Sequence, residues 1–284
     1  MELGTHLINR RAFLISGTGL LTGSGYSCIA EPRWLDSPET LVRIPSAVPH
    51  QLRVVQLSDL HASFFVPLGM IDHAVKVAVA QRPDIICVTG DMITHQGGFN
   101  SAEYVRVLKQ LSAAAPTYAT LGNHDGGSWA AQHRGYADHS IVDRLFEDSG
   151  IELLHNRHRR LEIRGQALNL VGVGDLWSQE LNAPRAFQGL QRGIPTILLS
   201  HNPDSKDALG MFDWDLMLSG HTHGGQVIIP FDGPRFAPVN DKRYIAGLGQ
   251  WNDRQIYVTR GVGNVGGVRF RCRPEVSTLH LQYG

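Results

Sequence analysis

Two histidines, His221 and His223, flank a single threonine, with one glycine before them and two after. Side chains two residues apart on an extended chain point to the same side, and neutral imidazole is a common metal ligand. The glycines allow a sharp turn and a close approach of the backbone. The pair could hold a metal ion or could be two polar side chains in an exposed loop, so the choice depends on whether further ligands converge on it.

Polar residues at the ends of other predicted strands could supply those ligands. They are Asp59, His61, Asp91, Asn123, His124 and His201. With the histidine pair they offer carboxylates, imidazoles and one amide carbonyl, and they include no thiolate. This set suits Mn, Fe or Zn and does not suit a sulfur-bound structural zinc. Because the groups are too many for one ion, two ions that share a carboxylate would use seven of them and leave one imidazole free.

Alternating strands and helices must position these groups. Apolar runs and helical stripes predict, in order, a strand at 52–57, a helix at 68–81, a strand at 84–89, a helix at 102–111 and a strand at 117–121. The intervals from Asp59 to Asp91 and from Asp91 to Asn123 are each 32 residues, about the length of one strand–helix–strand unit. Such units deliver strand ends to one edge of a parallel sheet, where open α/β folds place their sites.

The second half of the chain adds one helix and several short strands. The pattern predicts the helix at 141–148 and strands at 168–173, 195–199, 215–218, 227–229, 255–259 and 276–282. His201 follows the strand at 195–199, and His221 follows the strand at 215–218. We find no low-complexity segment, no coiled coil and no clear second domain in the sequence.

The composition is that of an ordinary globular protein. The chain has 284 residues, of which 42% are hydrophobic and 18% charged, and its formal net charge is zero. It therefore carries no nucleic-acid-binding signature. Its 14 histidines exceed what surface positions require, which fits a use in metal binding or proton transfer.

Residues 1–30 have the pattern of a targeting segment. The run Asn9–Leu14 contains paired arginines followed by Phe-Leu, as in twin-arginine export signals, and the weakly apolar stretch 15–26 is too short for a confident membrane span. Cleavage could follow Ala30; the alternative is a disordered basic tail. We expect export by the twin-arginine machinery to a periplasmic or membrane-associated location, an extended proline-containing lead-in at 31–51, and one folded domain at 52–284.

The three cysteines favour no firm disulfide. Cys87 lies inside an apolar run and is expected to be a buried small hydrophobe. Cys28 and Cys272 could pair in an oxidising periplasm, but cleavage after Ala30 would remove Cys28 and exclude that bridge.

The ordered motifs are Asp-x-His, Gly-Asp, Gly-Asn-His-Asp, a lone His after a strand, and Gly-His-x-His. This series resembles the calcineurin-like metallophosphoesterases over residues 52–282. The motifs at 202–206, 241–244, 259–263 and 272–276, beside the Arg-Arg signal, are similar to those of a twin-arginine-exported bacterial phosphodiesterase branch. The resemblance implies an α/β fold, a β-sandwich of two mixed sheets flanked by helices, with a dimetal site at the strand C-terminal ends.

The resemblance also implies a role for each candidate ligand. Asp59, His61 and His223 would bind the first ion. Asn123, His201 and His221 would bind the second ion. Asp91 would bridge the two ions, and His124 would lie beside them without ligating either. Because no position of the pattern is missing, a degenerate, non-catalytic version of the fold is not expected.

These ligands predict a metal-dependent phosphoesterase, with phosphodiesterase the favoured activity. Two ions about 3.5–4 Å apart would clamp a phosphoryl group and turn a bridging water into hydroxide near neutral pH, which would attack phosphorus in line. The leaving alkoxide needs a proton, for which His124 is the candidate general acid. Asp125 would hold the His124 ring and raise its pKa.

Two alternatives remain open from the sequence. The apolar loop Ser63–Pro67 lies just after the Asp-x-His motif. Burial under the following helix is its simplest explanation, but Phe64 and Phe65 could instead form an apolar rim that receives a lipid-linked phosphoester. The second activity would then be that of a UDP-2,3-diacylglucosamine-type pyrophosphate hydrolase. A metal-stabilised binding module without turnover is opposed by the complete ligand set and by His124.

Several nearby residues have two explanations each. Asn202 and Gly122 could touch the site or could only shape turns. Arg260 could bind substrate phosphate or could pair with a carboxylate. The segment Asp175–Trp177 follows a predicted strand, so it could line the site or simply pack beside it. The sequence leaves the natural substrate and the oligomeric state open.

Overall fold

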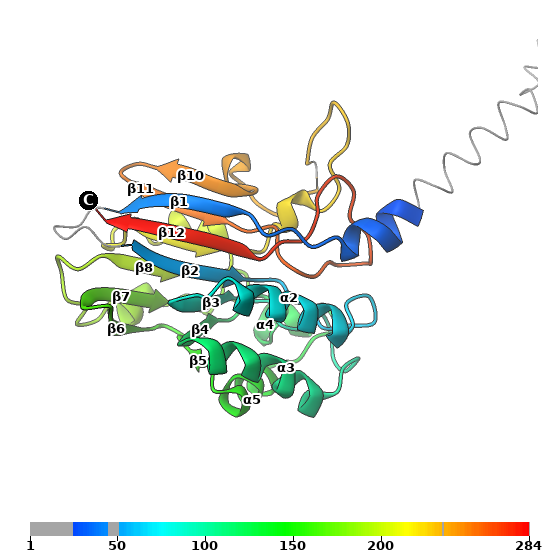
Figure 1. Ribbon diagram of the computed structural model, residues 1–284, viewed down its shortest axis with the longest axis horizontal. Coiled ribbons are helices and arrows are strands. Elements are labelled where there is room, and N and C mark those ends of the chain that lie inside the picture. The colour runs from blue at the N-terminus through cyan, green and yellow to red at the C-terminus, as the bar shows by residue number, and fades with distance from the viewer. Residues whose placement is uncertain (1–24, 45–50, 235, 284) are drawn as a thin grey trace, which may run out of the picture.

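The computed structural model describes residues 25–44, 51–234 and 236–283, which are built around two six-stranded sheets (Figure 1). The first sheet has the order β1 (Glu39–Ile44), β12 (Ser277–Tyr283), β2 (Gln51–Leu57), β3 (Ile85–Thr89), β4 (Thr117–Thr120) and β5 (Glu152–Leu153). The second has the order β10 (Gly247–Trp251), β11 (Arg254–Val258), β9 (Leu216–Ser219), β8 (Thr196–Leu199), β7 (Gln166–Gly172) and β6 (Arg157–Ile163).

Both sheets combine parallel and antiparallel pairs. Strands β2 to β5 are parallel to one another, whereas β12 is antiparallel to β2. In the second sheet β7, β8, β9 and β11 are parallel, and the edge strands β6 and β10 are antiparallel to their neighbours. The predicted parallel core and the expected pair of mixed sheets are both confirmed.

Three longer helices, α2 (Leu68–Ala80), α3 (Ser101–Ala114) and α5 (Ser140–Ser149), lie together on the outer face of the first sheet (Figure 1). Each helix buries one apolar stripe; in α2 this stripe includes Ile71 and Val75, which pack in one cluster with Val55 of β2. The shorter helical segments are η1 (Tyr26–Ala30), η2 (Glu31–Arg33), α4 (Gly127–Gln132), α6 (Ala183–Ala186), η3 (Pro203–Lys206), η4 (His223–Gly225) and η5 (Lys242–Tyr244).

The two sheets enclose a shared apolar core. Val54 and Ile85 of the first sheet pack in one cluster with Leu170, Ile197 and Leu216 of the second. Because helices cover the other face of the first sheet, all five residues of β3 are buried. A strand buried on both faces reads as a continuous apolar run rather than an alternating one, as the β3 sequence does.

The structure differs from the expected element boundaries in three places. The segment expected to be an extended lead-in contains β1, which pairs with β12, so the fold begins before Leu52. The predicted strand at 227–229 is wrong, since Val227 and Ile229 form only isolated bridges and Pro230 ends the run. Strand β10 was not predicted because its two glycines weaken the apolar pattern.

The twin-arginine motif at Asn9–Leu14 lies outside the described residues, so its prediction stays untested. The described chain starts with the short η1 turn, none of whose residues is buried. Among the described helices, none has the length and apolar character needed to cross a bilayer. Cys28, Cys87 and Cys272 are all free thiols, with Cys87 buried as expected, and the Cys28–Cys272 pair is not bonded.

Candidate metal centre

The predicted ligands gather where five strands end. Asp59 and His61 follow β2, Asp91 follows β3, and Asn123 follows β4, while His201 follows β8 and the pair His221 and His223 follows β9. Backbone hydrogen bonds continue past the strand ends and hold these turns together. The N–H of Asp59 donates to the carbonyl of Gly90, and the N–H of His61 donates to the carbonyl of Asp91, both at 2.9 Å.

The backbone at the site adopts an uncommon conformation. Five of the predicted ligands have left-handed φ angles, namely Asp59 (53°), His61 (48°), Asp91 (55°), His221 (70°) and His223 (51°). Side-chain-bearing residues rarely adopt this region, and each instance costs free energy. The concentration of such residues on one group of turns indicates that the fold imposes the conformation in order to aim the side chains.

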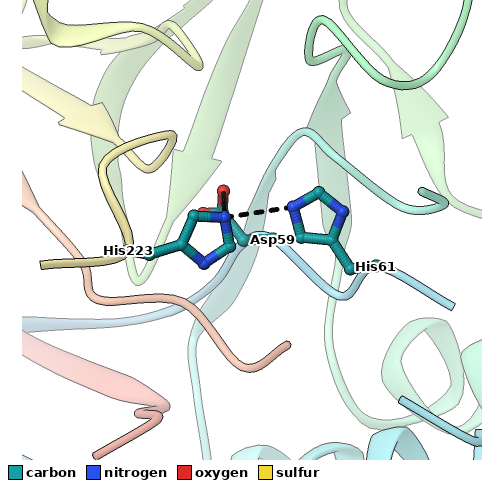
Figure 2. Close-up of side chains that lie close together, drawn as sticks. All are labelled: Asp59, His61 and His223. Atoms are coloured by element: carbon teal, nitrogen blue, oxygen red, sulfur yellow. Dashed lines mark hydrogen bonds and ion pairs between the residues drawn. The ribbon is translucent and has the colours of Figure 1, made fainter. Parts of the chain in front are cut away.

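Asp59, His61 and His223 form a compact first cluster (Figure 2). The Nε2 atom of His223 lies 3.1 Å from Nε2 of His61 and 3.4 Å from Oδ1 of Asp59. Both rings are neutral in the buried site, because burial lowers the pKa of His61 to about 3 and lowers the pKa of His223 well below its usual value. Two lone-pair nitrogens and a carboxylate oxygen at these separations fit a shared divalent ion.

The second cluster meets the first at Asp91. One carboxylate oxygen, Oδ2, lies 3.4 Å from Nε2 of His61 and 3.2 Å from Nε2 of His201. His201 Nε2 in turn lies 3.3 Å from Nδ1 of His221. A single oxygen placed between imidazoles of both clusters is the position that a bridging ligand requires.

Hydrogen bonds on the far side of the rings fix which nitrogen faces the centre. Nδ1 of His201 donates to the carbonyl of Thr89 at 2.7 Å, and Nδ1 of His61 lies 3.1 Å from the Thr94 hydroxyl. Both contacts leave Nε2 as the nitrogen that faces Asp91. Such partners fix the tautomer of metal-binding histidines and orient their rings.

Unpaired buried atoms and competing charges also indicate that this centre binds cations. Asn123 Oδ1 is buried with no hydrogen-bond partner among the described residues, and buried polar atoms are rarely left so. Burial, together with the nearby Asp91 charge, raises the pKa of Asp59 to about 6. Burial alone would lower the pKa of His201, but Asp91 and Asp59 hold it well above its usual value. Two divalent ions would relieve both conflicts, so the residues present fit the dimetal site.

At two positions the backbone passes so close to a candidate ligand that only glycine fits. A Cβ atom on Gly122 would lie 2.2 Å from Oδ1 of Asp91, and one on Gly220 would lie 2.3 Å from Oδ2 of Asp59. Neither position can carry a side chain without displacing a ligand. Gly122 therefore contributes by its lack of a side chain, and Asn202 acts as a turn residue whose side chain accepts the N–H of Asp204 at 2.9 Å.

His124 lies beside both clusters and is partly exposed. Its Nδ1 contacts the carbonyl of Thr94 at 2.9 Å, which makes Nδ1 the donor and leaves Nε2 available. Its ring meets that of His61 edge to face at 4.9 Å. The ring is also close enough to Asp91 and His61 to act as a ligand, so metal content must accompany any test of its role.

The expected contact between Asp125 and the His124 ring is wrong. Asp125 is fully buried, and its carboxylate accepts the backbone N–H groups of Asp91 at 2.9 Å, Met92 at 2.6 Å and Gly122 at 2.8 Å. The orienting group for His124 is the Thr94 carbonyl instead. Burial and the Asp91 charge raise the pKa of Asp125 to about 8, whereas the three donors favour its ionised form.

Aromatic side chains flank the centre on its second-ion side. Trp177 meets the His221 ring edge to face at 4.3 Å, so the segment Asp175–Trp177 does line the site. Trp129 of α4 meets the His124 ring at 4.7 Å and lies 5.8 Å from Trp177. Trp129 was not predicted, because the helix that carries it is too short to give a periodic signal.

The two remaining uncertain positions have clear surroundings. Arg260 forms ion pairs with Glu275 and, at 3.0 Å, with Asp36, so it has a structural role rather than a substrate contact. Burial under the next helix holds for Val66 but not for the two aromatic residues of the loop, since Phe64 is 88% exposed and Phe65 is 52% exposed. An exposed aromatic pair thus follows the Asp-x-His ligands directly.

Comparison with known proteins adds independent information. The sequence profile of the calcineurin-like phosphoesterase family matches residues 52–225, a range that contains every predicted metal ligand. The chain is 37% identical over 278 residues to phosphodiesterase YaeI of Escherichia coli (strain K12), a match that covers 97% of this chain and 100% of that protein.

Two further relatives match over most of their length. The chain is 29% identical over 289 residues to YkuE of Bacillus subtilis (strain 168), described as an uncharacterized metallophosphoesterase, with 97% and 98% of the two chains covered. It is 27% identical over 280 residues to LpxG of Chlamydia muridarum, described as a UDP-2,3-diacylglucosamine pyrophosphatase, with 82% and 84% covered.

Proposed function

Since this chain belongs to the calcineurin-like phosphoesterase family, a family of hydrolases that use two divalent metal ions, we propose that it is a phosphodiesterase. The observation that carries the proposal is the position of Asp91 Oδ2 between His61 and His201. The similarity to phosphodiesterase YaeI supports a diester substrate. The nitrogen and oxygen ligand set is compatible with Mn, Fe or Zn.

Different residues of this chain would have different roles in hydrolysis. Bound ions would neutralise charge on the phosphoryl group and lower the pKa of a water molecule between them. His124 is the general acid: the Thr94 carbonyl holds its Nδ1 hydrogen, so Nε2 can give a proton to the leaving oxygen. Asp125 is a positioning residue, since it fixes the backbone from which Asp91 projects.

The experiment that tests this function is hydrolysis of bis-p-nitrophenyl phosphate by the Mn-loaded protein. We expect turnover that a chelator abolishes and that added Mn restores. Absence of turnover in protein shown to contain its full complement of metal would instead support a metal-stabilised binding module.

Lipid-linked phosphoesters are the second candidate substrate class. Phe64 and Phe65 follow His61 by three and four residues and are both exposed, and exposed apolar patches mark surfaces that bind apolar ligands or partners. The LpxG relative is described as acting on a nucleotide-linked lipid. A pyrophosphate bond in such a molecule presents the same phosphoryl group to the metal centre.

Export through the twin-arginine machinery belongs to the same proposal. The Arg10-Arg11-x-Phe13-Leu14 motif supports it, and it would place the enzyme in the periplasm or at the membrane surface. Fractionation of cells that express the full chain tests it. We expect the Arg10→Lys/Arg11→Lys variant to remain in the cytoplasm, and unchanged export of that variant would contradict the proposed route.

A further inference from the structure

A second group of potential metal ligands lies outside the dimetal centre. His139, His155 and Glu180 each offer one ligand atom, and these atoms lie within 4.8 Å of one another. His139 precedes α5, His155 follows β5, and Glu180 lies in the loop after β7. The two imidazole rings are 5.2 Å apart. Three segments distant in sequence therefore bring two imidazoles and one carboxylate to one point.

The hydrogen bonds around this group leave its ligand atoms available. Nδ1 of His139 donates to Oδ2 of Asp143 at 2.7 Å, which leaves Nε2 of His139 with its lone pair. Nδ1 of His155 is buried and has no hydrogen-bond partner among the described residues. A carboxylate behind one histidine and an unpaired nitrogen on the other are features of prepared metal sites.

The third side chain is held in place through its backbone. The N–H of Glu180 donates to the carbonyl of Asp175 at 3.0 Å, and the carbonyl of Glu180 accepts from the side chain of Asn156 at 2.8 Å. Its carboxylate lies against Gly127, where a Cβ atom would be only 2.8 Å from Oε1. Burial lowers the pKa of His155, which favours the neutral imidazole that can bind a cation. Burial also raises the pKa of Glu180, a shift that a bound cation would oppose.

We propose that His139, His155 and Glu180 bind a third divalent cation, separate from the pair that shares Asp91. Two imidazole nitrogens and one carboxylate oxygen form a ligand set typical of zinc. Asp143, whose Oδ2 accepts from Nδ1 of His139 at 2.7 Å, would orient that imidazole rather than act as a ligand. The three side chains are only partly buried, so an ion could enter from solvent.

An ion at this site would stabilise the two segments that carry Trp129 and Trp177 beside the catalytic centre. Gly127, which packs on Glu180, begins the helix that carries Trp129. The hydroxyl of Ser128 donates to the carbonyl of Ser178 at 3.0 Å and joins that helix to the Trp177 loop. The third ion would therefore hold the two loops that flank His124 and His221, and its role would be positional.

Elemental analysis of the zinc-saturated full chain after gel filtration tests the proposal. We expect three zinc ions per wild-type chain and two in the His155→Asn and Glu180→Gln variants. His73→Asn, which changes an exposed histidine of α2, is the matched control and should keep all three. Glu180→Gln conserves size and backbone contacts, so it provides the count if His155→Asn does not fold.

A second arm separates this site from the proposed function, because it requires no turnover. The Asp91→Asn variant should lose an ion from the dimetal centre and still release one zinc on further substitution of His155. A wild-type content of two ions, or equal zinc content in wild type and Glu180→Gln, would overturn the third site. Neither result would count against the proposed phosphodiesterase activity, because neither measures turnover.

Discussion

One carboxylate oxygen of Asp125 accepts the backbone N–H of Asp91 at 2.9 Å and thereby fixes the turn from which the Asp91 carboxylate projects. The other oxygen accepts the N–H of Met92, so the whole turn is tied to one buried side chain. In the proposed mechanism Asp125 would therefore act on the metals through Asp91, and it does not contact the ring of His124, the proposed proton donor.

The Asp125→Asn variant should therefore weaken metal binding. An amide places an N–H₂ group where a backbone donor now binds, so the turn must shift and carry Asp91 with it. Loss of an outer hydrogen bond of this kind typically costs about 10–100-fold in metal affinity or activity. Zinc titration followed by calorimetry measures the change, with the exposed Asp148→Asn as control; equal affinities in the two variants would contradict the positioning role.

The His124→Ala variant separates proton donation from metal binding. General acid catalysis contributes about 10²–10⁴-fold, but only where the leaving group needs a proton. We expect a loss of that size for a diester with an alkyl alcohol leaving group. The loss should be much smaller for p-nitrophenolate, which leaves as a stable anion.

Metal content decides how the His124 result is interpreted, because His124 lies close enough to His61 and Asp91 for all three to bind one ion. We expect the variant to retain the wild-type metal content. A parallel fall in metal content and in both activities would show that His124 is a ligand and remove its role as the acid.

Metal-induced stabilisation should depend on pH near 6. Burial raises the pKa of Asp59 to about 6 in the metal-free protein, above about 3.9 for the unfolded chain. The protonated carboxyl therefore favours the metal-free fold at low pH, and this contribution is lost as pH rises from about 4 through 6. Metal binding needs the ionised form.

Thermal unfolding with and without Mn measures this linkage. The rise in Tm caused by Mn should be small at pH 5 and should increase through pH 6 to a plateau near pH 7.5. The same rise at pH 5 and pH 7.5 would show that no proton leaves the Asp59 cluster when the metal binds.

The Phe64→Ala/Phe65→Ala variant tests the lipid-linked substrate class. Burial of even one aromatic side chain contributes about 1.5–3 kcal/mol, so kcat/KM for a lipid-linked phosphoester in vesicles should fall about tenfold or more. Activity on bis-p-nitrophenyl phosphate should not change. Met211→Ala removes another exposed apolar side chain and is the control; an unchanged ratio of lipid to soluble activity in the double variant would remove this candidate.

The positions of the candidate ligands were predictable because each one follows the carboxyl end of a buried apolar strand. Asp59 and Asp91 come two residues after the ends of neighbouring parallel strands, and periodicity is enough to place such positions. Strand β1 was missed because prolines border it and four of its six residues are exposed or partly exposed, which gives no clear apolar pattern.

Side-chain direction in the turns was not predictable in the same way. Asp125 follows His124 in sequence, but the turn sends the carboxylate toward Asp91 and the ring toward Thr94. Trp129 reaches the centre from a six-residue helix that has no counterpart in the apolar pattern. Contacts of this kind depend on the three-dimensional path of loops, which periodicity does not describe.

The central claim is that Asp91 joins two metal ions into one hydrolytic centre. The most direct measurement is metal content and bis-p-nitrophenyl phosphate turnover of the Asp91→Asn variant beside wild type. We predict one fewer bound ion per chain and a loss of turnover of about 100-fold or more, since the shared charged ligand is gone. A variant that keeps the wild-type metal content and full turnover would contradict the bridging role and with it the account of catalysis.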